Sequence, residues 1–256
     1  MYVEASAPLP RDPADLAAFK RAVRTAKNAG AHVIRTVMLG GRRYESFHSQ
    51  EAFEAFAKQS WTSLTLAEPI VRQRQMKLAI ENHKDWRIGD LLGLMKRISS
   101  EYIGICVDTG NNVALLEDPN AVAEAFAPYA YSVHLKDMAV EPYQDGFLLS
   151  EVPLGRGMLD LPRIVQTLRQ ARPGIHFNLE MITRDPLTIP CLTENYWTTF
   201  PKLPGGDLAR TLVMVRERKH PVPLPRVSQL SMAERVKVED DNVRKSQAYA
   251  RDNLGL

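Results

Sequence analysis

The chain has 256 residues, of which 45% are hydrophobic and 25% are charged, and its formal net charge is +3. This composition is typical of a globular protein long enough for one large α/β domain or two small ones. The small, mixed charge argues against a nucleic-acid partner. No apolar run of about 18 residues predicts a membrane span, and no signal peptide is visible, so a cytoplasmic location is expected.

The first two thirds of the chain alternate short apolar segments with longer amphipathic ones. Strands are expected at residues 2–7, 32–38, 77–81, 103–108, 131–135 and 175–180. Helices are expected between them at about 12–28, 49–75, 88–100, 119–126 and 161–170. Pro69 lies inside the second of these helices and predicts a kink or a break there.

The remaining segments are less regular. Residues 138–159 are expected to form a long loop, which holds the Leu-Gly-Arg-Gly segment at 154–157. Several prolines and a Gly-Gly pair predict an irregular stretch after residue 184. Helices are expected at about 207–219 and 232–253, with an extended linker between them. We therefore expect a main domain over residues 1–220, followed by a linker and C-terminal helix over 221–256.

Strands that alternate with helices predict a parallel sheet built from βαβ units. The strands are apolar on both faces, as expected for strands covered on both sides. Six units are recognisable, whereas a closed (β/α)8 barrel needs eight. The fold class expected is therefore a TIM-barrel type α/β fold that lacks its first two βα units.

Four of the expected strands end in a side chain that can bind a metal ion, namely Glu81, Asp108, His134 and Glu180. The carboxyl ends of parallel strands meet at one edge of a sheet, which is where α/β enzymes place their chemistry. Three carboxylates and one imidazole at that edge predict a site for a divalent cation. Two simpler interpretations stay open: Asp108 could cap a helix, and His134 could be a hydrogen-bonded core residue. Cys106, inside a strand, is expected to be a core residue.

Five segments together resemble a known family. They are IENH at 80–83, VDTGN at 107–111, VHLKD at 133–137, LGRG at 154–157 and FNLEM at 177–181. They are similar in order and spacing to the sugar phosphate isomerase/epimerase family, the xylose isomerase-like TIM barrels that include ketose 3-epimerases, inosose dehydratases and AP endonucleases. The resemblance implies that Glu81, Asp108, His134 and Glu180 bind one Mn2+, Mg2+, Co2+ or Zn2+ ion. It also aligns the first strand with the family's third.

The AP endonuclease branch is a poorer match than the rest of the family. That branch has a histidine three residues after the aspartate, where this chain has Asn111. It also has an Asp-x-His before the Gly-x-Gly loop, where Leu149 and Glu151 stand here. The additional zinc ligands are therefore not matched, and a single-ion site is expected.

The resemblance implies an isomerase or epimerase that acts on a small carbohydrate, phosphorylated or not. In such enzymes the cation holds a carbonyl and a neighbouring hydroxyl, and a carboxylate removes the adjacent proton to give an enediolate. Glu81 and Glu180 are the expected proton-transfer pair. A dehydratase or other lyase on a keto-sugar or keto-inositol is the alternative, as is a non-catalytic truncated barrel.

Further residues are candidates for binding the substrate, and a homo-oligomer is left open. His83, Asn111 and Lys136 lie beside the expected ligands, with a plain loop or helix-end role as the alternative for His83 and Lys136. A structural salt bridge is the favoured interpretation of Arg35, and substrate binding is the alternative. Arg156 in the Gly-Arg-Gly loop could hold a phosphate or carboxylate.

Overall fold

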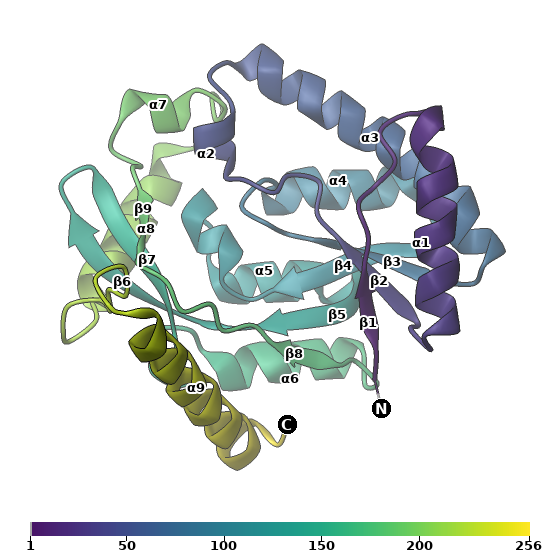
Figure 1. The fold of residues 1–256 in the computed structure, drawn as a ribbon. Coiled ribbons are helices and arrows are strands. Elements are labelled where there is room, and N and C mark those ends of the chain that lie inside the picture. Colours follow the sequence, from purple (N-terminus) through teal and green to yellow (C-terminus); the bar gives the residue numbers. More distant parts are fainter. Residues whose placement is uncertain (1) are drawn as a thin grey trace.

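The computed structural model describes residues 2–256, which form a curled half-barrel of six parallel strands with helices along its outside (Figure 1). The strand order is β1-β2-β3-β4-β5-β8. The strands are β1 (Glu4–Ser6), β2 (Val33–Thr36), β3 (Lys77–Glu81), β4 (Ile103–Asp108), β5 (Ala130–Leu135) and β8 (Phe177–Leu179). All six expected strands are present, and the prediction of an incomplete barrel is confirmed.

The connections between these strands are helical, as expected for βαβ units. They contain η1 (Pro13–Asp15), α1 (Leu16–Asn28), α2 (Arg43–Ser46), α3 (Gln50–Gln73), α4 (Ile88–Ile98), η2 (Asn111–Leu115), α5 (Pro119–Phe126), η3 (Ala127–Tyr129) and α6 (Leu161–Ala171). The side chains of Ser49, Asp118 and Asp160 cap α3, α5 and α6 by accepting hydrogen bonds from backbone amides. These caps fix where the helices begin.

Pro69 does not break its helix, so the expected break is absent. Helix α3 runs from Gln50 to Gln73 with Pro69 inside it. A proline removes one backbone hydrogen bond and leaves a carbonyl without its donor. Pro69 lies on the exposed side of α3, where water can reach that carbonyl.

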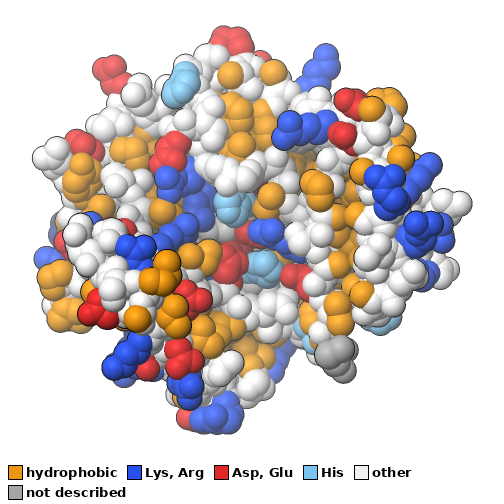
Figure 2. Space-filling view, viewed as in Figure 1, with side chains coloured by type: hydrophobic (Ala, Val, Ile, Leu, Met, Phe, Trp, Pro, Cys, Tyr) orange, Lys and Arg blue, Asp and Glu red, His pale blue; other side chains and the backbone are white. Residues whose placement is uncertain are grey.

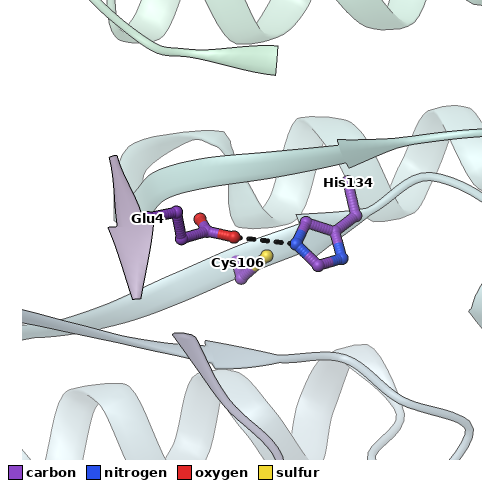
Figure 3. Close-up of side chains that lie close together, drawn as sticks. All are labelled: Glu4, Cys106 and His134. Atoms are coloured by element: carbon purple, nitrogen blue, oxygen red, sulfur yellow. Dashed lines mark hydrogen bonds and ion pairs between the residues drawn. The ribbon is translucent and has the colours of Figure 1, made fainter. Parts of the chain in front are cut away.

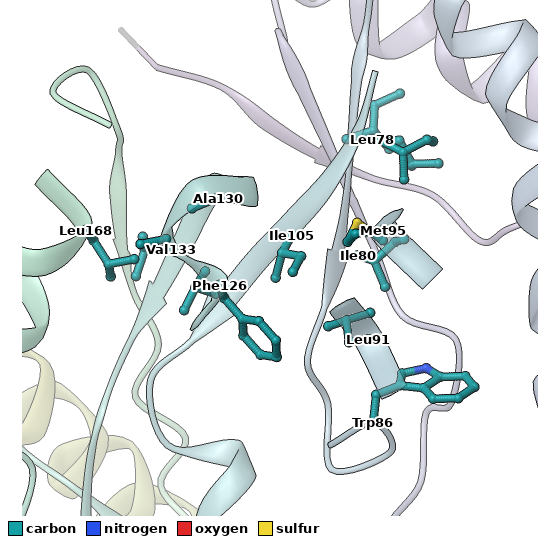
Figure 4. Close-up of a cluster of buried hydrophobic side chains, with 14 of the residues drawn as sticks. Leu78, Ile80, Trp86, Leu91, Met95, Ile105, Phe126, Ala130, Val133 and Leu168 are labelled. Atoms are coloured by element: carbon teal, nitrogen blue, oxygen red, sulfur yellow. The ribbon is translucent and has the colours of Figure 1, made fainter. Parts of the chain in front are cut away.

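The main core lies between the outer face of the sheet and the helices (Figure 4). Strand residues such as Leu78, Ile105 and Val133 are fully buried there. They pack against helical residues such as Leu91 of α4 and Phe126 of α5. Because successive strand side chains point to opposite faces, the alternate residues point into the barrel.

The inner face carries the polar side chains. Glu4 of β1 reaches across the barrel to His134 of β5, and its Oε2 also accepts a hydrogen bond from Asn178 of β8 at 3.4 Å. Tyr2 stacks on His176 with ring centroids 3.9 Å apart. The sheet thus curls until side chains from its two edges meet, although β1 and β8 do not pair among the described strands.

The prediction of a long loop at 138–159 is wrong for most of its length. Residues Asp137–Tyr143 (β6) and Gly146–Val152 (β7) form an antiparallel hairpin, and β9 (Leu187–Ile189) adds a third strand. The Asp145–Gly146 pair is a hairpin turn signal. Pro142 obscured the pattern, but it lies in β6 at the edge of this small sheet, where a missing amide is tolerated.

The C-terminal part packs onto the barrel. The stretch after residue 184 is irregular apart from β9 and α7 (Glu194–Trp197), and the expected helices are α8 (Gly205–Glu217) and α9 (Met232–Tyr249), which continues into η4 (Ala250–Leu254). Leu254 lies in the main core. The domain boundary near residue 220 stays a prediction. None of the helices within residues 2–256 has the length and apolar character needed to cross a membrane.

Candidate metal centre and active site

The four side chains at the strand ends lie together. One ligand atom from each of Glu81, Asp108, His134 and Glu180 can be chosen so that all four atoms are within 4.8 Å of one another. Glu81 and Asp108 are the last residues of β3 and β4, and both are fully buried. Asp108 pairs in register with His134 on the adjacent strand, and Glu180 follows β8 directly.

His134 is held between two carboxylates. Its Nδ1 lies 2.6 Å from Glu180 Oε2. Its Nε2 lies 2.9 Å from Glu4 Oε1, and Figure 3 shows this contact beside Cys106. Burial opposes charge on the ring, but the neighbouring Cys106, Glu180 and Glu4 side chains raise the pKa of His134. The two distances show that Nδ1 faces the cluster of strand-end residues and that Nε2 is anchored by Glu4. Burial also raises the pKa of Cys106 to about 11, which keeps that thiol neutral.

The two oxygens of Asp108 have different environments. Oδ1 accepts hydrogen bonds from the amides of Gly110 and Asn111 at 2.9 and 2.8 Å, so the capping interpretation applies to this oxygen. Oδ2 is buried, and its one close partner within residues 2–256 is the ammonium of Lys136, 2.7 Å away. One oxygen is thus fixed by the backbone, and the other is directed at the cluster.

Lys136 lies among three carboxylates. Its Nζ is 2.7 Å from Asp108 Oδ2, 2.9 Å from Glu180 Oε1 and 3.7 Å from Glu151 Oε1. Burial alone would lower the pKa of Lys136, but these carboxylates raise it. Burial likewise opposes charge on Glu180, yet His134 and Lys136 hold the pKa of Glu180 far below its usual range.

Glu81 is bound from two sides. Its Oε2 accepts a 2.5 Å hydrogen bond from Nε of Arg35, and its Oε1 accepts a 3.3 Å hydrogen bond from Nδ2 of Asn111. Burial and the nearby Asp108 raise the pKa of Glu81, while Arg35 lowers it. Arg35 thus forms the salt bridge that was the favoured interpretation of this residue.

The donor set fits a divalent cation. Three carboxylates and an imidazole are ligands that Mg2+, Mn2+ and Zn2+ accept. The buried Asp108 Oδ2 is directed into the cluster and, within residues 2–256, is compensated by the ammonium of Lys136 alone, so this group of carboxylates requires a cation. Lys136 supplies positive charge at the same place.

The other candidate residues fall into two groups. Asn111, Lys136 and Arg35 contact members of the cluster directly. His83 is half-buried, and its Nδ1 donates to the Leu39 carbonyl at 3.0 Å. Burial and then Lys84 lower the pKa of His83 to about 4, so the ring is neutral.

Arg156 lies outside the group of four strand-end residues. It is exposed, and it lines a separate pocket of about 370 Å³ with Arg218, Lys219 and His220. The loop that carries it is held by Asp137, whose carboxylate accepts hydrogen bonds from the amides of Gly155 and Gly157 at 3.0 and 2.9 Å. The structure therefore does not bring Arg156 to the four strand-end residues.

Sequence reasoning missed several polar residues of the inner face. Glu4 interrupts an apolar strand, and that interruption was the available signal. Glu151 of β7 bonds to Arg184 at 2.9 Å, and its hairpin was not expected. Lys84 donates from its Nζ to Oδ1 of Asn111, and nothing in the sequence distinguishes it from a surface lysine.

One cavity of the molecule adjoins Arg35. It has a volume of about 740 Å³, lies between the carboxyl ends of β1 and β2 and helix α3, and has Arg35 but none of the four clustered side chains in its lining. Arg35 thus links this cavity to Glu81. Figure 2 shows a hollow near the centre of one face of the molecule, where acidic, basic and histidine side chains gather.

A family model described as the xylose isomerase-like TIM barrel matches residues 4–200. The chain belongs to the xylose isomerase-like TIM barrel family. This match covers the six parallel strands and the four clustered residues.

Solved structures of this family have similar folds. A D-psicose 3-epimerase solved in the presence of D-fructose is similar with a TM-score of 0.62 and 13% identity, over 100% of this chain and 80% of that one. A xylose isomerase-like protein from Mycobacterium smegmatis, solved with magnesium, has a TM-score of 0.55 and 16% identity, over 82% of this chain and 74% of that one.

One curated relative is similar in sequence. The 3-oxo-isoapionate decarboxylase of Pectobacterium atrosepticum (strain SCRI 1043) is 32% identical over 134 residues. The match includes 51% of this chain, and it spans about half the length of that relative.

Proposed function

We propose that this protein is a metal-dependent isomerase or epimerase of a small carbohydrate, and that it transfers a proton next to a carbonyl through an enediolate. The observation that carries the proposal is the convergence of Glu81, Asp108, His134 and Glu180 within 4.8 Å. A divalent cation bound there would polarise the carbonyl and stabilise the negative charge that develops on its oxygen. These four residues are the proposed ligands.

Glu180 and Glu81 are the proposed proton-transfer pair. Glu180 is the less buried of the two and has one oxygen beside His134 and the other beside Lys136, which fix its orientation. Glu81 is oriented by Arg35 and Asn111. One carboxylate removes the proton from carbon, and the other returns a proton from the opposite face. Lys136 keeps Glu180 ionised and therefore able to accept a proton.

A second candidate reaction is decarboxylation of a 3-oxo sugar acid. The similarity to 3-oxo-isoapionate decarboxylase favours it. In that reaction the bond between the α-carbon and the carboxylate would break, carbon dioxide would leave, the bonding electrons would form an enediolate, and Glu180 or Glu81 would protonate the α-carbon. The proposed site would thus serve either reaction, and the substrate would decide between them.

Isotope exchange tests the proposal. Mn2+-loaded protein is incubated in deuterated water with D-fructose or D-psicose, and deuterium next to the carbonyl is followed by NMR. We expect exchange with wild-type protein and none with Glu180→Gln, whose fold is checked by circular dichroism. A Glu180→Gln variant as active as wild type would remove Glu180 from the proton-transfer role. Carbon dioxide release from 3-oxo-isoapionate without exchange into either ketose would favour the decarboxylase.

A further inference from the structure

Lys84 differs from the other buried basic side chains. Arg43, Lys84 and Lys136 are the buried basic residues within residues 2–256. Arg43 pairs with Asp90 at 3.1 Å, and Lys136 pairs with Asp108 at 2.7 Å. Lys84 is 4% exposed, yet no carboxylate of the described chain lies within ion-pair distance of its ammonium.

The ammonium of Lys84 is also incompletely hydrogen-bonded. It has three N–H donors, and among residues 2–256 one acceptor side chain, Asn111 through its Oδ1, is within bonding distance. Buried charges in proteins are normally paired, because an unpaired charge loses its hydration without compensation. Burial and the positive charge of Lys136 accordingly lower the pKa of Lys84 to about 8. The ammonium of Lys84 therefore lacks a counter-ion among the described residues.

Lys84 lies so close to the proposed metal centre that a counter-ion bound to its ammonium would also lie there. Asn111 accepts from Lys84 through one end of its amide and donates to Glu81 through the other. Lys84 is therefore one side chain away from a proposed metal ligand. The charges of Asp108 and Lys136 also act on it.

The backbone of Lys84 adds a second, independent observation. Its φ is 62°, in the left-handed region that glycine adopts without cost. A lysine in this conformation is strained, and strained residues concentrate at functional sites. The Lys84 carbonyl accepts a hydrogen bond from the Arg43 amide at 3.0 Å, which fixes the chain at this point, and the Lys84 side chain is buried.

We propose that Lys84 binds an anionic group, a carboxylate or a phosphate, of the carbohydrate substrate, and thereby makes the site selective for sugar acids or sugar phosphates. This inference rests on the proposed function, since it requires a substrate held at the same metal centre. Lys84 would be a specificity-determining residue, because its ammonium gains a partner only when the anion is bound.

Equilibrium binding to Mn2+-loaded protein tests this inference. The probes are D-arabitol, D-arabinonate and D-arabitol 5-phosphate, which share a carbon skeleton and differ in charge, and calorimetry measures each dissociation constant. We expect wild type to bind at least one anionic probe about tenfold or more tightly than D-arabitol. The better anionic probe identifies the group as a carboxylate or a phosphate.

Variants of Lys84 distinguish anion binding by its ammonium from anion binding by the metal ion. Lys84→Gln should lose about tenfold or more of the affinity for the anionic probe, with D-arabitol unchanged. Lys84→Arg should keep most of the preference, and Lys96→Gln, at an exposed lysine of α4, should behave as wild type. Mn2+ affinity is measured in each.

Two results would overturn the inference. A wild-type protein that binds all three probes equally contradicts it even where a variant does not fold. A folded Lys84→Gln protein that keeps the preference contradicts it as well, because direct binding of the anion to Mn2+ would then explain the selectivity. In both cases normal Mn2+ binding leaves the proposed function intact, whereas a folded wild type that binds no Mn2+ overturns both.

Discussion

The carboxylate of Glu4 lies 2.9 Å from Nε2 of His134, although 130 residues separate the two in sequence. A histidine that binds a metal through one ring nitrogen commonly donates from the other to a carboxylate, which fixes the ring orientation. Glu4 is placed for this role, because Nδ1 on the opposite side of the ring faces Glu180 and Glu81.

Removal of Glu4 should therefore weaken metal binding. We expect Glu4→Leu to lower the affinity for Mn2+ by about 10- to 100-fold. Glu4→Gln keeps an acceptor for Nε2–H and should lose less. Calorimetric titration of both variants measures this, with Glu124→Gln on the exposed face of α5 as the control. Unchanged Mn2+ affinity in Glu4→Leu would show that His134 needs no such anchor.

Lys136 should stabilise the metal-free protein. Its ammonium lies between Asp108 and Glu180, and removing one partner of a buried ion pair typically costs about 3–5 kcal/mol. We expect Lys136→Met to lower the free energy of unfolding in urea by about 3 kcal/mol without metal. Saturating Mn2+ should recover part of that loss, because the cation would compensate the same carboxylates. A metal-free variant as stable as wild type would contradict this.

Much of the fold could be predicted because each strand carries its own signal. Leu78, Ile80 and Ile105 mark apolar strands, and the polar residue that follows marks where each strand ends. The hairpin at 137–152 could not be predicted in the same way, because Pro142 interrupts its alternation. Glu4 and Lys84 could not be assigned either, because the partner of each lies in a distant segment. The curl of the sheet brings Glu4 to His134, and the pairing of β3 with β4 brings Lys84 to Asn111.

The buried carboxyl group of Asp85 should make the free energy of unfolding depend on pH. It is fully buried, its Oδ1 accepts from the amides of Trp86 and His83, and burial raises its pKa to about 7. The folded protein then holds a proton that the unfolded chain releases near pH 4. This group's contribution to stability is therefore present at low pH and declines as the pH rises from about 4 to about 7.

Asp85→Asn tests that contribution. The variant removes the charge and keeps an acceptor for the two amides. Its stability relative to wild type should improve between pH 4 and pH 7 by a few kcal/mol and stay level above about pH 8, since one pKa unit is worth about 1.4 kcal/mol. Urea unfolding of both proteins across this range provides the measurement. A difference that does not vary with pH would exclude the shifted titration of Asp85.

Gly157 is required by the Asp137 carboxylate that holds its loop. A Cβ at Gly157 would lie 2.2 Å from Asp137 Oδ1 and 2.4 Å from the Met138 carbonyl oxygen. We expect Gly157→Ala to lower the unfolding free energy by about 1–3 kcal/mol. Gly174→Ala is the matched control, since a Cβ there meets nothing within 4 Å. Equal stabilities in thermal or urea unfolding would count against this role for Asp137.

Titration of the metal-free protein with Mn2+ tests the central claim most directly. We expect one ion to bind per wild-type chain, and Asp108→Asn to bind it about 100-fold more weakly, because Asp108 Oδ2 is the buried oxygen directed at the cluster. A folded wild type that binds no Mn2+, or an Asp108→Asn variant with wild-type affinity, would contradict the metal centre proposed at the four strand ends.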